Sequence, residues 1–238
     1  TLETVARSSF NDFNYAFGFQ LNNETLDIEY NDLARAEFDS DGKITKTADL
    51  FFLGGGQNVD ESRNKYGAFF EGEQEFFGSL GLRLAARYEK VDNFSSLDPK
   101  LSLRFNPIEE ITFRISRGTS FTMPSMAQMF SSDINLGSVR DLDDNIFVRQ
   151  ARIGNPDLKP ATSTNSNFGF VYDSDVNRFS LDYWEIDYRN RIEAESSQAL
   201  LDLDPQGPSI TRNDNGELIA VTTTSVSYTH LRAHETGY

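Results

Sequence analysis

Hydrophobic and polar residues alternate strictly on both sides of a short polar turn within residues 98–130. A period of two that resumes after a turn predicts a β-hairpin, here with strands at 98–105 and 111–116. The alternate positions carry mainly Lys, Arg, Ser and Thr, so one face of the hairpin requires an apolar environment and the other requires water. The apolar positions are Leu101, Leu103, Phe105, Ile111, Phe113 and Ile115.

The same alternation predicts further strands at 63–76, 79–90, 161–172 and 177–192. Residues 13–30 also alternate, but the apolar positions change parity partway along. Either a bulged long strand or a tight hairpin explains this change, and we favour the bulged strand. A similar change of parity within 177–192 predicts a second bulge. The chain then has about seven antiparallel strands.

The connections between these strands alternate in length. The short turns are 77–78, 107–109 and 173–176, and the longer connections are 31–62, 91–97, 118–160 and 193 onward. Successive connections of an antiparallel meander lie at opposite ends of the sheet, so the long loops share one end, as in outer-membrane barrels. We therefore predict an all-β antiparallel meander, an incomplete transmembrane β-barrel that forms an open curved sheet with long loops on one end.

The long connections contain local signals of their own. Residues 146–148 form a short apolar edge, 199–203 have a helical pattern, and 210–223 predict a small hairpin that turns at Asn213–Gly216. The rest of these connections has no sustained periodicity and is predicted to be loop.

Composition narrows the class of protein. The chain has 238 residues with 20 Phe, 9 Tyr and no Cys, and its formal charge of −15 excludes a nucleic-acid partner, which would require a basic stripe. No apolar run approaches the roughly 20 residues of a membrane helix. Placing Arg83 or Arg87 against lipid would cost about 2–4 kcal/mol each, so the Leu and Tyr parity is predicted to face outward. The tyrosines near strand ends then form either interfacial girdles or ordinary sandwich-core contacts; they are Tyr15, Tyr66, Tyr88, Tyr172 and Tyr183.

Two motifs resemble those of a known family. Residues 117–125, RGTSFTMPS, are similar to the strand-end motif S-x-G-F-R-A-P-S of TonB-dependent outer-membrane receptors, and residues 154–160, GNPDLKP, are similar to their loop-to-strand motif G-N-P-x-L-K-P-E. The resemblance covers about residues 13–226. Thr122 stands where the family usually has Arg, and Ala161 where it usually has Glu.

The resemblance implies a location, partners and a function. Receptors of this family lie in the outer membrane and contact its lipid, and they take up a scarce ligand such as an iron-siderophore complex, cobalamin or a glycan. Uptake is energised by TonB through a plug domain that is absent from this chain. Family barrels have 22 strands around that plug, so the chain is expected to be a barrel fragment. A soluble secreted β-domain such as a carbohydrate-binding module is the alternative.

Ligand contact is expected in the long loops, which share one end with the mouth of the barrel. The candidate ligand-binding residues are Phe51, Phe52, Phe121, Phe130 and Phe147. The alternative is that these aromatic rings only pack the loops against one another.

No catalytic residue, cofactor or metal site is expected. Residues 37–44 imitate the start of a calcium loop, but Ala48 occupies the place of its bidentate Glu, so a solvated acidic loop is favoured. The aspartates at 141, 143 and 144 are interpreted in the same way. His230 and His234 are four residues apart but lack the Glu of a zinc motif. Nucleophile elbows and phosphate loops are missing from the sequence, so an enzyme is not predicted.

The last segment, residues 227–238, departs from the strand pattern and resembles translated sequencing-adapter sequence. We expect it to be a non-native tail that packs poorly or forms an arbitrary helix. Residues 1–226 form the predicted partial barrel, whose two open edges carry backbone groups that hydrocarbon cannot satisfy. The chain alone is therefore not expected to insert stably or to transport.

Overall fold

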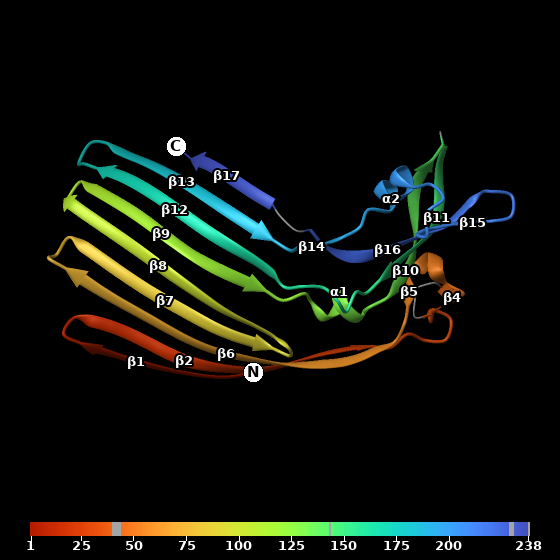
Figure 1. Ribbon diagram of the computed structural model, residues 1–238, viewed down its shortest axis with the longest axis horizontal. Coiled ribbons are helices and arrows are strands. Elements are labelled where there is room, and N and C mark those ends of the chain that lie inside the picture. Colours follow the sequence, from red (N-terminus) through yellow and green to blue (C-terminus); the bar gives the residue numbers. More distant parts are fainter. Residues whose placement is uncertain (40–43, 143, 229–230, 238) are drawn as a thin grey trace.

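The computed structural model describes residues 1–39, 44–142, 144–228 and 231–237. Within these residues, nine strands form one antiparallel sheet in sequential order, from β1 to β17 (Figure 1). The strands are β1 (Leu2–Phe10), β2 (Phe13–Ile28), β6 (Val59–Phe76), β7 (Leu80–Val91), β8 (Phe94–Ile108), β9 (Ile111–Thr122), β12 (Ala161–Asp173), β13 (Arg178–Arg189) and β17 (Leu231–Gly237). This arrangement confirms the predicted meander, with more strands than the seven expected.

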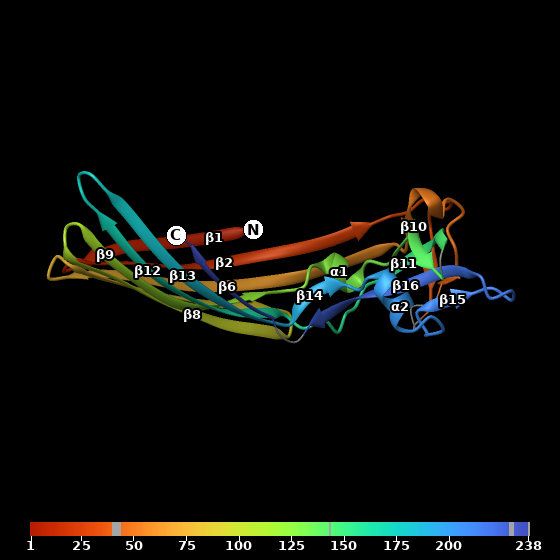
Figure 2. The same ribbon diagram turned by 90° about the horizontal axis from the view of Figure 1, so that it is seen from above.

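The sheet curves into a trough and does not close. Figure 2 shows β8 at the bottom of the arc, with the edge strand β1 and the strand β13 above it. No backbone pairing joins β1 to β17 within the described residues. The predicted open curved sheet is therefore confirmed, and its right-handed strand twist supplies the curvature.

Neither predicted bulge is present. Strand β2 pairs with β6 without a break from Asn14↔Glu73 to Ile28↔Val59, and β13 pairs with β12 in one continuous register. The change of parity has another cause, because the apolar side chains change face along a regular strand. In β2 the outward residues near Phe19 are exposed, whereas Leu26 and Ile28 lie on the opposite face and are half-buried.

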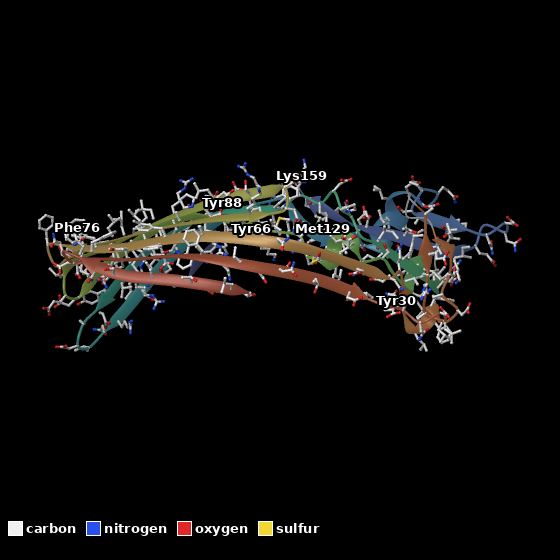
Figure 3. The ribbon with its side chains drawn as sticks, turned by 90° about the horizontal axis from the view of Figure 1, so that it is seen from below. Tyr30, Tyr66, Phe76, Tyr88, Met129 and Lys159 are labelled. Carbon is white, nitrogen blue, oxygen red and sulfur yellow. The ribbon has the colours of Figure 1, made fainter. Side chains whose placement is uncertain are left out.

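The two faces of the nine-stranded sheet differ in polarity. One face, called here the apolar face, carries cross-strand rows such as Phe105, Phe113 and Phe170, and the rings of Phe113 and Phe170 are 5.3 Å apart. Phe105 and Phe113 are exposed, and Phe170 is half-buried. Figure 3 shows Tyr66 and Tyr88 along the strands, between Phe76 at the tight-turn end and Tyr30 toward the other end.

The opposite face carries the charged parity, as expected. Three of its arginines, Arg83, Arg87 and Arg114, pair with acids on neighbouring strands or nearby positions. Arg83 lies 2.8 Å from Glu73, and Arg114 donates two hydrogen bonds to Asp182 at 2.8 and 3.1 Å. We call this the charged face.

Several sequence expectations about the connections were wrong. Residues 91–97 are not a loop, because β7 and β8 form a hairpin that turns at 92–93, where Asp92 adopts a positive φ of 49°. The chain start, for which the sequence analysis predicted no element, forms β1, which pairs with β2 through a two-residue turn. The connection at 118–160 contains helix α1 (Met126–Phe130) and a hairpin of β10 (Asp133–Asp141) and β11 (Asp144–Ile153).

A second sheet lies at the end of the long loops, and we call it the cap sheet (Figure 1). It contains β5 (Gly55–Gly56), β10, β11, β14 (Arg191–Ala194), β15 (Ile210–Arg212) and β16 (Leu218–Tyr228). The hairpin predicted at 210–223 and the helix predicted at 199–203 are confirmed, as β15–β16 and as α2 (Ser197–Leu203). The first long loop also contains β3 (Glu37–Phe38), β4 (Ile44–Lys46) and the short helix η1 (Phe51–Leu53).

The last described segment is a strand rather than a helix, because β17 pairs with β13 from Tyr188↔Leu231 to Asp182↔Gly237. Its side chains, including that of Leu231, lie outside the described part, so its poor packing and non-native origin stay predictions. Among the described residues, no helix is long and apolar enough to cross a membrane.

Candidate functional site

The two faces of the cap sheet have different environments. On one face, Val139, Val148 and Val221 form a small core, over which α2 places the buried Leu201. These valines come from three strands, so the core forms only when the loops assemble. The α2 helix is short, and its apolar contact with the sheet supplies the stability that its length cannot. This face is therefore structural.

The other face of the cap sheet forms the floor of a cavity of about 810 Å³. Hydroxyl side chains dominate its lining, which also contains two cations, Arg149 and Arg212, and one carboxylate, Glu195. The Arg149 guanidinium donates a 2.7 Å hydrogen bond from Nη1 to Thr47 Oγ1. In the part of the chain that the structure describes, no carboxylate lies within ion-pairing distance of Arg149. Glu195 instead accepts from the Thr224 backbone N–H at 2.9 Å.

Backbone pairing builds this floor from distant segments. Strand β11 pairs in parallel with β16, with Arg149 beside Ala220, and antiparallel β15 places Thr211 beside the same alanine. Thr211, Ala220 and Arg149 thus form one row across three strands. The small side chain of Ala220 beside Arg149 leaves room above the sheet on that side.

Of the five candidate phenylalanines, Phe147 lies nearest to Arg149 in sequence and on the same face of β11. Its side chain is 74% exposed, and Leu136, which pairs with Arg149, is also exposed. A cation and exposed apolar groups therefore lie side by side at this surface. We call Leu136, Phe147, Arg149 and Thr47 the cap site.

The structure does not bring the other four phenylalanines to this site. Phe51 packs against the small core of Ala36, Ala48 and Ile134, and Phe52 meets the Phe51 ring edge-on at 6.1 Å. Phe121 lies on β9 at the parity of the apolar face, and Phe130 ends α1. None of the five lines the cavity itself. Their role in ligand binding stays a prediction.

Sequence reasoning missed Arg149 and Thr47. Alternation of Phe147, Arg149 and Ala151 along one short strand was the available signal. This alternation was not recognised because the segment carries charged residues and lies between predicted loops. Only the apolar residues at 146–148 were noted.

Two acidic groups of the cap have shifted pKa values. The Arg212 guanidinium beside Asp141, with Nη1–Oδ2 at 2.7 Å and Nη2–Oδ1 at 2.9 Å, lowers the pKa of that carboxyl. Burial raises the pKa of Asp133, against an opposing effect of Arg152. Burial, with a contribution from the Asp133 charge, also raises the pKa of Tyr30.

The metal-like patterns of the sequence fall partly outside the described residues. Residues 40–43 of the acidic loop, Asp143 and His230 are not described, nor is the side chain of His234. Over the described residues, no group of three His, Asp or Glu side chains is placed to hold a metal ion.

The two motifs noted in the sequence meet at the base of the cap. Thr122, the last residue of β9, pairs directly with Ala161, the first residue of β12. At these two positions the family motifs usually carry Arg and Glu, so both expected charges are replaced together at one cross-strand pair. The change removes a possible charge pair without leaving either charge alone.

The assembly is thus a segment of β-barrel wall with a loop cap at one end. A sequence model described as "TonB dependent receptor-like, beta-barrel" matches residues 2–224. The chain belongs to this family of outer-membrane receptors, which are transport proteins rather than enzymes. The family decides between the two alternatives of the sequence analysis in favour of the receptor.

Solved structures agree with the fold. A mutant ferric enterobactin receptor, PfeA of Pseudomonas aeruginosa in complex with enterobactin, is 17% identical with a TM-score of 0.67, covering 98% of this chain and 32% of its own. The siderophore receptor PirA of Pseudomonas aeruginosa is 15% identical with a TM-score of 0.65, covering 98% and 37%. The Serratia marcescens hemophore receptor HasR, in complex with HasA and heme, is 13% identical with a TM-score of 0.60, covering 98% and 37%.

The chain spans about a third of the length of these receptors. A search of curated proteins found no match.

Proposed function

We propose that this chain is part of an outer-membrane receptor that takes up a scarce ligand, such as an iron-siderophore complex, with energy supplied by TonB. In this proposal the apolar face contacts outer-membrane lipid and the charged face lines a wet lumen. Energy coupling comes through TonB and a plug domain, which the family resemblance assigns to a segment other than this chain.

The observation that carries the proposal is the segregation of the two faces over the strands from β2 to β13. Rows of exposed aromatic and aliphatic side chains cover one face, and arginines of the other face such as Arg83 and Arg114 have acidic partners. A water-soluble protein rarely exposes so large an apolar surface. A barrel wall does so by necessity, because its outer surface must match hydrocarbon.

The cap site supports capture of an anionic ligand. Arg149 is a cation whose hydrogen bond within the described residues goes to a neutral hydroxyl, so its charge is available to a ligand. The exposed Phe147 ring beside it adds an apolar contact, and the surrounding hydroxyls can donate or accept hydrogen bonds. Ferric complexes of acidic chelators combine negative charge with polar oxygens and flat rings. They are therefore favoured over neutral glycans at this surface.

Uptake by cells that lack their own receptors tests the function. The complete reading frame that carries this segment is expressed, and accumulation of radioactive iron is measured for a panel of ferric siderophores. We expect saturable uptake of an anionic complex that stops when the proton gradient is collapsed. Uptake that persists without the gradient would contradict energised transport.

Arg149→Met tests the cap site separately. Losing a charged hydrogen-bond donor should raise the ligand concentration needed for half-maximal uptake by roughly 10- to 100-fold. Arg178→Met is the matched control, because Arg178 is an exposed arginine at the tight-turn end of the sheet. If Arg149→Met and Arg178→Met have the same half-saturating ligand concentration, the cap site does not bind the ligand. The assignment of the chain to a receptor would not be affected.

Residues 1–226 alone are expected to transport nothing, since the open sheet edges cannot be satisfied in hydrocarbon. Expression of this segment by itself in the same cells checks the expectation. Gradient-dependent uptake above the empty-vector level would overturn the fragment hypothesis.

A further inference from the structure

The wall of the sheet is interrupted above the β7–β8 hairpin. The hairpin turns at 92–93, but β6 continues beyond it, so residues 59–64 have β2 as partner on one side and no strand on the other within the described chain. On the far side of the hairpin, β9 beyond Gly118 pairs with β12 alone. Helix α1 lies beyond the tip of the hairpin, between β6 and β12 (Figure 1).

A buried arginine connects β6 to the segment that leads into α1. Arg63 is 6% exposed and lies opposite Glu24 of β2. Its Nε donates to Glu24 Oε2 at 2.7 Å, and its Nη1 donates to the Pro124 carbonyl oxygen at 2.8 Å. Met129 Sδ lies 4.0 Å from the same Nη1. One guanidinium therefore joins two wall strands to the loop.

Glu24 has a second cationic partner, Lys65, on the same strand as Arg63. The charge of Glu24 can thus be balanced without Arg63. The contact with the Pro124 carbonyl comes from Arg63, and it is the contact that reaches across the interruption.

Helix α1 cannot hold its own position. It has five residues, far fewer than an isolated helix requires, although Ser125 and Gln128 form a reciprocal capping box. Its other side meets the second motif, where the Asn155 backbone N–H donates to the Gln128 carbonyl oxygen at 3.0 Å. A Cβ on Gly154 would lie 2.7 Å from the Met129 carbonyl oxygen, so this approach is tight.

The contacts continue into the cap. The Asn155 side-chain amide donates to the Ser225 carbonyl oxygen of β16 at 2.9 Å. A path of hydrogen bonds therefore runs from Glu24 through Arg63 and α1 to the cap sheet.

We propose that Arg63 is the positioning residue that holds the α1 segment in the wall above the β7–β8 hairpin. Through Asn155, the same contact fixes β16 of the cap relative to the wall. This role goes beyond ligand uptake and does not depend on which ligand is bound. The uncharged pair of Thr122 and Ala161 is consistent with this role of Arg63. Strands β9 and β12 supply no charge at this pair, and the cation at the junction is Arg63 of β6.

Cysteine accessibility tests the proposal, since residues 1–238 contain no Cys, and the receptor without the probe measures the background from the rest of the reading frame. Met126 of α1 is buried, with 6% of its surface exposed, so a Met126→Cys probe should react slowly with a maleimide when α1 is seated. The probe is introduced into the complete receptor in outer membranes. Labelling rates are then compared in three backgrounds: unchanged, Arg63→Met and Lys65→Met.

We expect Arg63→Met to raise the labelling rate of the probe roughly tenfold or more, because a charged donor to a buried carbonyl is lost and α1 opens more often. Lys65→Met is the matched control. It removes the other cation beside Glu24 but leaves the Pro124 contact, so its rate should stay close to that of the unchanged background.

Heat-modifiable migration verifies that each variant retains a folded barrel. A Phe147→Cys probe in the cap, already 74% exposed, should label equally in all backgrounds. If Arg63→Met does not reach the membrane, Arg63→Lys keeps the charge beside Glu24 without the planar fork and should give a smaller rise. Equal labelling of Met126→Cys in the Arg63 and Lys65 variants, or no rise in any Arg63 variant, would overturn the proposal.

Discussion

The ion pair between Asp141 and Arg212 is expected to hold the outer end of the cap together. It joins the last residue of β10 to β15, and its side chains are 12% and 15% exposed. Two parallel N–H···O bonds make it bidentate, the geometry in which Arg–carboxylate pairs are strongest. Asp141→Asn removes the charge while nearly preserving the size of the side chain.

The expected cost is about 2 kcal/mol. Breaking a fully buried pair costs about 3–5 kcal/mol because the remaining charge has no partner. Arg212 retains two other acceptors here, the carbonyl oxygens of Pro205 at 3.2 Å and Gly216 at 3.0 Å, so the loss is smaller. At about 1.4 kcal/mol per tenfold, the local opening equilibrium of the cap should shift about thirtyfold.

The effect should also depend on pH in a defined direction. Arg212 lowers the pKa of Asp141 in the folded chain below its value in the unfolded chain. The pair therefore stabilises the cap fully above the unfolded pKa of about 4, and the stabilisation is lost as pH falls through the lower, folded pKa. Asp141→Asn should lack this component.

Hydrogen exchange measured by mass spectrometry on the complete receptor checks both expectations. Peptides covering β10 and β15 should exchange faster in Asp141→Asn, whereas peptides from β7 and β8 should not change. Asp173→Asn, in the exposed pair with Arg178 at the opposite end, is the control and should shift exchange by less than about 1 kcal/mol. Unchanged exchange of β10 and β15 at neutral pH would refute the reasoning.

Two further substitutions test the faces and the junction. Ile115→Arg, on the apolar face, should cost about 2–4 kcal/mol if that face meets lipid near the midplane, whereas Ser116→Arg on the charged face should cost little; the folded fraction in a heat-modifiability gel measures the difference, and equal folding would contradict the lipid assignment. Gly154→Ala should destabilise the junction by about 1–3 kcal/mol because its Cβ would lie 2.7 Å from the Met129 carbonyl oxygen. Gly81→Ala is the control, because its Cβ would lie 3.6 Å from the nearest atom, Arg104 Nε. Equal denaturant midpoints for the two variants would contradict the expected loss of stability in Gly154→Ala.

Much of the wall was determined by the sequence itself. The alternation around Leu103 and Ile115 predicted both the strands and the polarity of their faces, because the side chains of a strand point alternately to its two sides. Turn residues and loop lengths then predicted the sequential order and the common end of the long loops. The family motifs added the barrel class.

The sequence pattern misled where the environment of a strand changes along its length. The changes of parity in β2 and β13 were predicted as bulges, yet both strands are regular. Near Phe19 the apolar side chains lie exposed on the apolar face, and near Leu26 they lie on the opposite face, where they are half-buried. A change of parity in the sequence has the same appearance whether the strand contains a β-bulge or remains regular while its apolar residues move to the other face.

Only the tertiary structure decided how the cap assembles. The parallel pair of Arg149 and Ala220 joins residues 71 positions apart, and the Arg63 contact with Pro124 joins residues 61 apart. Very short strands such as β5, of two glycines, have no local signal strong enough to identify their partners. The partner of such a strand is determined by the tertiary structure, because buried backbone N–H and C=O groups must form hydrogen bonds. The available partners are the segments that the fold brings close together.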